Sequence, residues 1–298
     1  MTSPLDRPQP QAPASKLRII GVAGCLALLV LLQACSTLTL GYNRAATLSY
    51  WWLDSQLDLS ETQSQQVRAD LDDLHRWHRR EALPRYAGVL LSWEQLARQD
   101  INAAQACEQF EAARAQLLQI AERSARPLAQ LGQTVTPAQR EHLQRQHAKD
   151  NQRFREDFVD APRFGLSQRV KRLTDRLEMF YGRLEPAQRQ LVQDHLARGS
   201  FDGNIALAER ERRQADVLQT IAAIQANPAQ GPALVRAVVQ RAVDSPAVRY
   251  RTASRQWQRE GCELVAALHN SSSAAQRQSV AENLRSYNGD FTLLAQQD

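Results

Sequence analysis

The sequence has few residues that build strands or sharp turns. Glycine and proline number only 12 each in 298 residues, and aromatic residues make up 6%. Runs rich in β-branched and aromatic side chains are almost absent, so strands have little to form from. Alanine, leucine, glutamine and arginine dominate instead, and these residues lose little side-chain freedom in a helix. The composition therefore predicts an all-α protein.

Familiar catalytic motifs are also missing. The sequence has no glycine-rich loop that would cradle a phosphate, no zinc-type cysteine spacing and no G-x-S-x-G. The best candidate for chemistry is the surface patch His75, His78, Arg79, Arg80 and Glu81. Its two histidines and glutamate are spaced by three, so they drift around a helix by about 60° per step. The flanking arginines would oppose a bound cation. We therefore predict no metal, no cofactor and no enzymatic activity.

The excess of positive charge is small. The net charge is +5, and part of it lies before Cys35, where Arg7, Lys16 and Arg18 outweigh Asp6. The remaining basic residues are spread evenly along the chain and nearly balanced by acidic ones. Nucleic-acid binding calls for a basic stripe or cluster, so we exclude nucleic acid as a partner.

The N-terminus has the layout of an export signal. A short basic region with Lys16 and Arg18 precedes the apolar run Ile19–Leu32. A helix that spans a bilayer needs about 20 apolar residues, whereas a run of this length suits the core of a signal peptide. An uncleaved signal anchor in the inner membrane is the alternative.

The apolar run ends in Leu32-Gln33-Ala34-Cys35, which resembles the bacterial lipobox. Gln33 departs from the small residue that is usual at its position. The resemblance implies cleavage between Ala34 and Cys35 and attachment of lipid to Cys35. Acyl chains contribute about 0.8 kcal/mol per buried methylene, and two or more anchor a protein stably. Ser36 follows the cysteine, which in lipoprotein sorting favours the outer membrane, with the protein on its periplasmic face.

Two cysteines remain after this processing. Cys25 lies in the segment that would be removed, and Cys107 and Cys262 stay in the mature chain. An even pair in the oxidising periplasm favours a disulfide. Two separate buried thiols are the alternative, because sequence does not show whether the two residues meet.

A tetrapeptide recurs along the chain and predicts where helices begin. In each copy a capping residue is followed three places later by glutamine, as in a capping box. The copies are SETQ (60–63), NAAQ (102–105), TPAQ (136–139), EPAQ (185–188), NPAQ (227–230) and SAAQ (273–276). Apolar residues at helical spacing follow them. We expect an irregular antiparallel multi-helix bundle. The alternative is an α-solenoid, since the copies stand about two helices apart.

The chain divides into three segments on this evidence. We assign residues 1–34 to a signal peptide, 35–58 to a lipidated N-terminal segment and 59–298 to an α-helical domain, with a weak sub-boundary near 198–204. In the second segment, Tyr50, Trp51 and Trp52 are consecutive and cannot all face one way on a helix. One ring is suited to the lipid headgroup level, but we expect all three in the core, since large aromatic residues supply much of a core's burial.

Longer stretches resemble a known family. They are LGYNRAATLSYWWLDSQLDLSETQ after Cys35, HRWHRREALPRYAGVL (75–90), DNQRFREDFVD (150–160) and RLEMFYGRLEPAQRQLV (176–192). Together they resemble an uncharacterised family of Gram-negative lipoproteins, known as a domain of unknown function. The resemblance implies an α-helical periplasmic lipoprotein with no assigned activity. LSETQ (59–63) and VTPAQ (135–139) are also similar to the LTxxQ motif of the periplasmic chaperones Spy and CpxP, which are small helical cradles.

These observations lead to a functional prediction. We expect a lipid-anchored, non-enzymatic envelope protein that binds other proteins, as an assembly or stress accessory or a chaperone-like factor. One alternative is a structural lipoprotein that braces the envelope. Another is a metal-dependent envelope enzyme that uses His75, His78 and Glu81.

Overall fold

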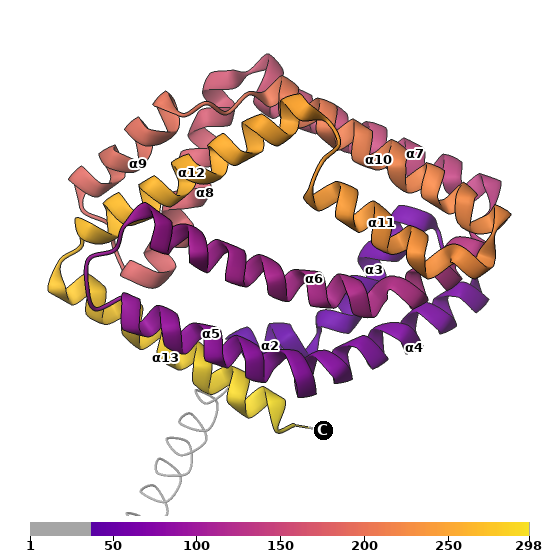
Figure 1. Ribbon diagram of the computed structural model, residues 1–298, viewed down its shortest axis with the longest axis horizontal. Coiled ribbons are helices and arrows are strands. Elements are labelled where there is room, and N and C mark those ends of the chain that lie inside the picture. Colours follow the sequence, from indigo (N-terminus) through magenta and orange to yellow (C-terminus); the bar gives the residue numbers. More distant parts are fainter. Residues whose placement is uncertain (1–36, 298) are drawn as a thin grey trace, which may run out of the picture. The chain divides into compact units, whose positions relative to one another are not determined.

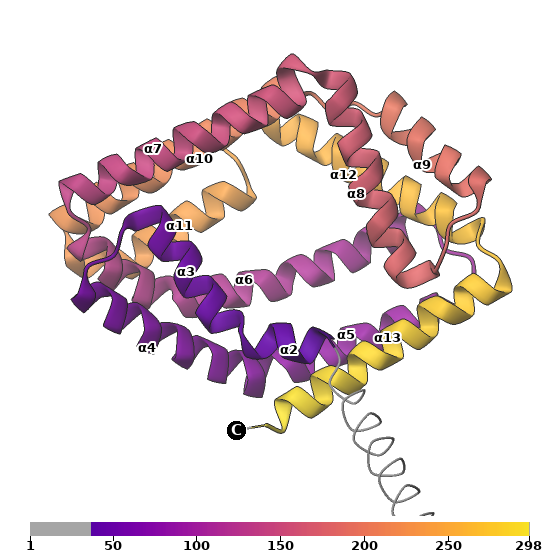
Figure 2. The ribbon, with the colours of Figure 1, turned by 180° about the vertical axis from the view of Figure 1, so that it is seen from behind.

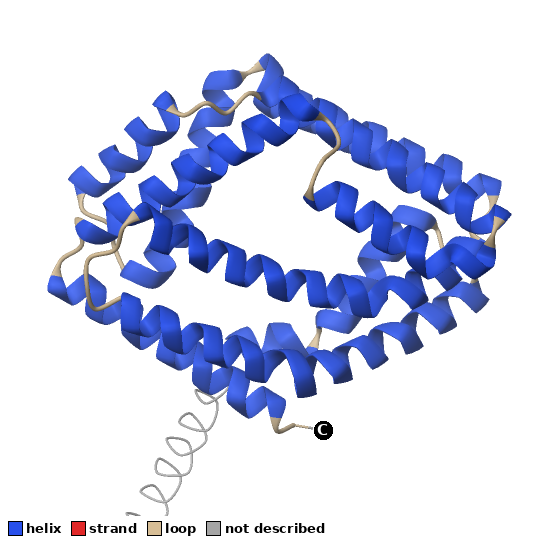
Figure 3. Ribbon diagram, viewed as in Figure 1, coloured by secondary structure: helices blue, strands red, loops and turns tan. Residues whose placement is uncertain are grey.

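The computed structural model describes residues 37–297, and every regular element in that range is helical (Figure 3). The predicted all-α class is therefore confirmed. The chain separates into a unit that ends at Arg44 and a compact unit, Ala45–Asp298. The first contains the short helix α2 (Thr37–Asn43). We call the second the helical unit.

The helical unit contains long α-helices joined by short turns. In chain order they are α3 (Ala45–Leu57), α4 (Glu61–Trp77), α5 (Leu83–Leu96), α6 (Ala103–Thr134), α7 (Pro137–Arg155), α8 (Pro162–Tyr181), α9 (Pro186–Arg198), α10 (Gly203–Ala226), α11 (Gly231–Val243), α12 (Val248–Asn270) and α13 (Ala274–Ala295). Two π-helical turns, η1 (His78–Ala82) and η2 (Glu156–Asp160), and a 3₁₀ turn, η3 (Pro228–Gln230), connect some of them.

Capping boxes begin the helices at the predicted places. At Ser60, Asn102, Thr136 and Ser273 the side-chain oxygen accepts the amide hydrogen of the glutamine three residues on, and that glutamine's Oε1 accepts the cap's own amide hydrogen. At Glu185 the amide likewise donates to Gln188 Oε1, at 2.9 Å. The reason is local, because these bonds satisfy amides that the first turn of a helix leaves without a partner.

The predicted box at 227–230 is wrong. Pro228–Gln230 forms the 3₁₀ turn η3, and α11 begins only at Gly231. The Asn227 amide donates to Ala223 O at 3.0 Å and so ends α10. Because that amide already has an acceptor, it does not donate to the side-chain oxygen of Gln230.

The long helix α6 is the centre of the packing. Its first half runs antiparallel to α12, since Ile101 meets Asn270 just before α6 and Glu111 meets Gln258 further along. Its second half runs antiparallel to α11, where Arg236 donates to Glu122. In Figures 1 and 2, α12 meets α6 near the N-terminal end of α6, and α11 lies beside the C-terminal part of α6. Helix α6 therefore packs against α12 with its first half and against α11 with its second half.

Other antiparallel pairs join distant parts of the sequence. α13 lies along α5, where Asn288 donates to Ala87 O and Arg285 to Glu94 (Figure 2). α10 lies along α7 through Arg140 and Gln225. In a solenoid each repeat contacts only its neighbours. Because the last helices return to the first, the helical unit is a multi-helix bundle, as predicted.

The unit is continuous across the residues where we placed segment boundaries. Helix α3 packs against α4 and α7, so residues 45–57 belong to the bundle and not to a separate N-terminal segment. The turn at 198–204 lies inside the same compact unit. Among residues 37–297, no helix is both long enough and apolar enough to cross a bilayer.

Three apolar clusters hold the helices together. The largest gathers the buried residues Leu90, Ala97, Tyr181, Leu184, Val192, Leu264, Leu268, Val280 and Leu284 from helices at both ends of the chain. A second joins α3 to α7 and α10 through Leu57, Leu143 and Ile221. A third packs Ala125 and Ala129 of α6 against Ile224 and Val235. Burial of each valine, leucine or isoleucine in these clusters contributes about 1.5–3 kcal/mol, more than the roughly 1 kcal/mol of a single helix cap.

Four of the capping glutamines have a second, tertiary role. Gln63, Gln139, Gln188 and Gln276 are all buried, although each belongs to a helix terminus. They pair as Gln63 with Gln139 and Gln188 with Gln276, each side chain donating to the other's Oε1 at 2.6–3.1 Å. The same four-residue signal therefore starts four helices and joins their N-termini two by two.

Candidate functional site

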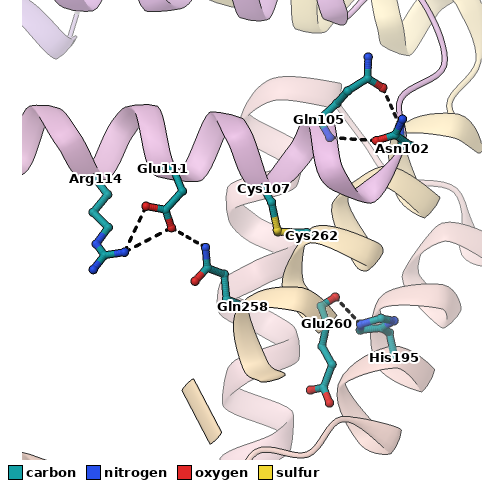
Figure 4. Close-up of a disulfide and its surroundings, with 9 residues drawn as sticks. All are labelled: Asn102, Gln105, Cys107, Glu111, Arg114, His195, Gln258, Glu260 and Cys262. Carbon is teal, nitrogen blue, oxygen red and sulfur yellow. Dashed lines mark hydrogen bonds and ion pairs between the residues drawn. A yellow bond between two sulfur atoms is a disulfide. The ribbon is translucent and has the colours of Figure 1, made fainter. Parts of the chain in front are cut away.

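A disulfide fixes the two helices that carry the site. Cys107 of α6 is bonded to Cys262 of α12, with the two Cα atoms 5.3 Å apart (Figure 4). One turn further along α6, Glu111 Oε1 accepts from Gln258 Nε2 at 2.7 Å. The disulfide and this hydrogen bond hold α6 and α12 in one register, so that the residues between them keep a fixed geometry.

Phe110 is the hub of the site. It lies on α6, close to the disulfide, yet 46% of its surface is exposed. Three neighbouring cavities share it as a lining residue. We call this connected set of cavities the Phe110 groove. A half-exposed phenylalanine that is shared by three cavities is a surface for apolar contact.

The first cavity of the groove is apolar and has a volume of about 280 Å³. Its lining residues come from α5, α6, α8, α12 and α13: Trp93, Leu96, Ala97, Ala106, Gln109, Phe110, Phe180, Tyr181, Val265, His269, Val280 and Leu284, with Ile101 from the preceding turn. The Nε1 atom of Trp93 is buried and meets no acceptor among the described residues. Buried donors are usually satisfied, so this N–H is an exception among the buried polar groups of residues 37–297.

Two polar side chains of that cavity are fully engaged. His269 Nε2 lies 2.9 Å from Gln99 O, and because a carbonyl only accepts, Nε2 carries the proton. Nδ1 therefore accepts from the Tyr181 hydroxyl, also at 2.9 Å. Burial lowers the pKa of His269 and raises the pKa of Tyr181 to about 12. The pair is neutral and hydrogen-bonded, which marks it as part of the scaffold.

The second cavity, of about 170 Å³, lies between α8, α9 and α12 and shares Val265 with the first. His195 Nε2 donates to Glu260 O at 2.7 Å (Figure 4). Burial raises the pKa of the Glu260 carboxyl, but hydrogen bonds from Gln256 and the Ser200 amide bring it below its usual value. The carboxylate is thus ionised and held in place.

The third cavity has the largest volume of the three, about 740 Å³. It lies near the middle of α6, between the part that packs against α12 and the part that packs against α11. It is lined by four arginines but only two acidic residues: Arg114, Arg213, Arg251, Arg255, Glu111 and Asp244. Arg213 is held by buried Glu209, at 2.7 Å, and Arg251 by Ser245 O, at 2.6 Å. This end of the groove is net positive and suits an anionic group.

A row of aromatic rings borders the groove. Neighbouring rings lie 4.8–6.2 Å apart in the order Phe154, Phe158, Phe201, Trp257, Tyr250. Guanidinium groups lie over four of them, at 4.2–5.9 Å from the ring centres: Arg210, Arg172, Arg169 and Arg213. Each such contact contributes about 0.5–1 kcal/mol at an exposed site. The row therefore links residues of α7, α10 and α12.

An apolar stripe extends from the groove along α6. Phe110, Leu117 and Leu128 point in nearly the same direction, because their spacings of 7 and 11 residues are close to whole helical turns. They are 46%, 64% and 40% exposed. The stripe is about 27 Å long at 1.5 Å per residue. Its length fits a segment of polypeptide better than a small molecule.

The residues predicted from sequence lie elsewhere. His75 lies in the last turn of α4, and His78, Arg79, Arg80 and Glu81 lie in η1, away from the lining of the Phe110 groove. His78 Nε2 lies 3.1 Å from the Tyr86 hydroxyl, whose ring in turn contacts Phe291. Burial, with help from His75 and Arg85, lowers the His78 pKa to about 4. Among residues 37–297, no cluster of three or more His, Cys, Asp or Glu side chains is arranged to hold a metal.

The predicted cleavage and lipidation residues, Ala34 and Cys35, lie outside the described residues. Sequence reasoning did not single out Phe110, Trp93 or the arginines that line these cavities. One signal was present, because Phe110 and Leu117 fall on one helical face. A stripe of this kind is typical of a core-facing helix. Only the positions of α11 and α12 show that the stripe is left uncovered.

The fold and the site together define an all-α protein whose capped helices frame an apolar groove edged by arginines. Within this class, the chain belongs to a family of unknown function, DUF6279, whose model matches residues 55–241. That match covers more than half of the chain and agrees with the predicted membership of an uncharacterised family. No curated protein and no solved structure matches the chain.

Proposed function

We propose that this protein is a non-enzymatic, lipid-anchored envelope accessory that binds an apolar segment of another protein in the Phe110 groove. The observation that carries the proposal is the exposure of Phe110 at the junction of three cavities, continued by Leu117 and Leu128 along α6. Large apolar side chains that are exposed on one face of a helix favour an interaction site.

The chemistry of the groove favours a polypeptide ligand. The apolar cavity accepts one or two large side chains. The arginines of the widest cavity, Arg114, Arg251 and Arg255 among them, favour acidic residues next to the apolar ones. We therefore expect clients that expose apolar residues flanked by aspartate or glutamate.

Features of the sequence support the proposed place of action. The lipobox-like Leu32–Cys35 supports anchoring at the periplasmic face of the outer membrane, with inner-membrane anchoring as the alternative. The Cys107–Cys262 disulfide agrees with an oxidising compartment. The likeness of LSETQ and VTPAQ to a chaperone motif supports a chaperone-like role for the groove.

The test is site-specific photocrosslinking in cells. A photoreactive phenylalanine analogue placed at Phe110, in the full-length chain, is expected to capture distinct protein bands. The matched control carries the analogue at Met179 of α8, which is 60% exposed and lies outside the groove. Capture from position 110 but not from position 179 supports the proposal.

A second measurement tests the arginines. Arg251→Glu combined with Arg255→Glu should reduce capture from position 110 several-fold, because a like charge opposes an acidic client. Equal capture from positions 110 and 179 would contradict the proposal, as would capture that is insensitive to the charge reversal.

A further inference from the structure

We propose that the outward face of α3, made by Leu48, Trp51 and Trp52, is a membrane-contact surface that seats the helical unit on the bilayer. This surface, which we call the α3 aromatic face, lies on the other side of its helix from the residues that pack into the bundle. Its three side chains are 54%, 59% and 63% exposed. Spacings of three and four residues place them together on one side of a helix.

The opposite side of α3 fixes its orientation. Tyr50 is buried, its hydroxyl meets Ser64 Oγ at 3.1 Å, and the Arg68 guanidinium lies 3.4 Å from its ring centre. Leu57 packs into the cluster with Leu143 of α7. Because α4 and α7 both hold this side, α3 cannot rotate to bury the tryptophans. The expectation that Tyr50, Trp51 and Trp52 all enter the core is therefore wrong for the two tryptophans.

Adjacent exposed tryptophans are unusual on a surface that faces only water. A helix that is apolar on both sides is normally covered on both, and an exposed apolar patch marks a partner. Tryptophan is favoured at the headgroup level of a bilayer, because its ring is apolar and its N–H is a hydrogen-bond donor. Helix α3 contains no lysine or arginine. The contact should therefore be apolar and insensitive to anionic lipid and to salt.

The length of the chain before α3 selects the bilayer as the partner. Residues 36–44 separate Cys35 from the first residue of α3. This linker spans at most about 35 Å when fully extended. With α2 helical, its reach falls to about 25 Å. An anchor at Cys35 thus keeps the first residue of α3 within about 25 Å of the anchored residue, in whichever direction α2 points. The inference rests on the membrane anchoring in the proposed function, but it does not require the groove.

The experiment measures tryptophan quenching in vesicles. The full-length acylated protein is reconstituted in phosphatidylcholine vesicles whose acyl chains carry bromine, which quenches tryptophans that reach the bilayer. We expect clear quenching in the wild type and at least a twofold loss of it in Trp51→Gln/Trp52→Gln. Trp257→Phe removes a tryptophan of α12 that contacts Phe201 and is the matched control. This variant should leave the bromine-dependent quenching unchanged. Salt at about 0.5 M should also leave it unchanged, because that ionic strength screens surface charges but not apolar contacts.

The outcomes separate the inference from the anchor. Vesicle flotation reports anchoring, and Cys35→Ser should abolish it. If the wild type floats but quenching is the same in Trp51→Gln/Trp52→Gln, the α3 contact is refuted and the anchor stands. If crosslinking in the vesicles yields a dimer that this variant abolishes, with no quenching, the face belongs to a second copy and the proposal is overturned. If the wild type does not float, both the anchor and the contact are refuted.

Discussion

Gln63 and Gln139 exchange hydrogen bonds across the bundle. Gln63 Nε2 donates to Gln139 Oε1 at 3.1 Å, and Gln139 Nε2 donates to Gln63 Oε1 at 2.6 Å. Each Oε1 also accepts the amide hydrogen of its own capping residue, at 2.9 Å and 3.0 Å. One side chain therefore closes a helix terminus and joins it to another. Gln188 and Gln276 repeat the arrangement for α9 and α13.

We predict strong coupling between the paired glutamines. Gln63→Ala and Gln139→Ala should each destabilise the protein by about 2–3 kcal/mol, because a buried amide loses its partner as well as a cap. Their effects should not add, with a coupling energy of about 0.5–3 kcal/mol in a double-mutant cycle. Urea unfolding of the two single variants and the double variant measures this.

Gln105→Ala is the matched control for that cycle. Gln105 forms the same box with Asn102, but its recorded hydrogen bonds stay within the box (Figure 4). Its loss should cost about 1 kcal/mol and show no coupling to Gln139. An equal cost for Gln105→Ala and Gln63→Ala would mean that pairing adds nothing to capping.

The disulfide should stabilise the bundle substantially. Cys107 and Cys262 are separated by 155 residues. Closing a loop of this length restricts the unfolded chain, with a model stabilisation of about 5 kcal/mol and a usual measured range of about 2–5. Cys107→Ala/Cys262→Ala should lower the urea midpoint accordingly, and a reductant should have the same effect on the wild type only. A reductant-insensitive wild type would show that the bond does not form.

Acid should destabilise the protein through His78. Its pKa in the folded protein is about 4, against an ordinary value of 6.5. Below pH 6.5 the unfolded chain takes up a proton that the folded protein resists, so stability falls as the pH drops from 6.5 to 4. In His78→Phe this part of the fall should be absent. Thermal melts of both proteins over that window test it; parallel curves would refute the assignment.

A close backbone contact should make Gly203 intolerant of a side chain. A Cβ at this position, the first of α10, would lie 2.2 Å from the carbonyl oxygen of Phe158 in η2. Gly203→Ala must therefore separate α10 from η2, at a cost of about 1–3 kcal/mol. Gly261→Ala is the control, because nothing lies within 4 Å of a Cβ there. Chemical denaturation should show a loss for the first variant and little change for the second.

Buried Glu209 should matter more than an exposed ion pair. Its carboxylate accepts from Arg212, Arg213 and Ser245 at 2.7–2.9 Å, and its side chain is 2% exposed. Glu209→Gln leaves Arg213 without its carboxylate partner and Arg212 with Asp216 alone, and it should cost about 3 kcal/mol. Glu122→Gln breaks the exposed pair with Arg236 and should cost under about 1 kcal/mol. Similar losses in the two variants would contradict this ranking.

The sequence by itself determined the features that depend on neighbouring residues. Helix formers and scarce strand formers set the all-α class, and five of the six predicted boxes start helices because a capping box needs only four consecutive residues. The sixth box, at Asn227, does not form, because the Asn227 amide donates to Ala223 O in the last turn of α10. The sequence indicated that Cys107 and Cys262 could pair, but it did not show the distance between them.

Only the tertiary structure decided what the helix faces meet. The period of α6 places Phe110 and Leu117 on one side, and that pattern alone suggests burial. They are exposed because α11 and α12 cover a neighbouring side of the helix. Likewise, the helical period requires Tyr50 and Trp51 to diverge, but the contacts with Ser64 and Arg68 chose which of them is buried. Local hydrogen bonds are fixed within a few residues, whereas exposure depends on the other helices, some of which lie more than a hundred residues away in the sequence.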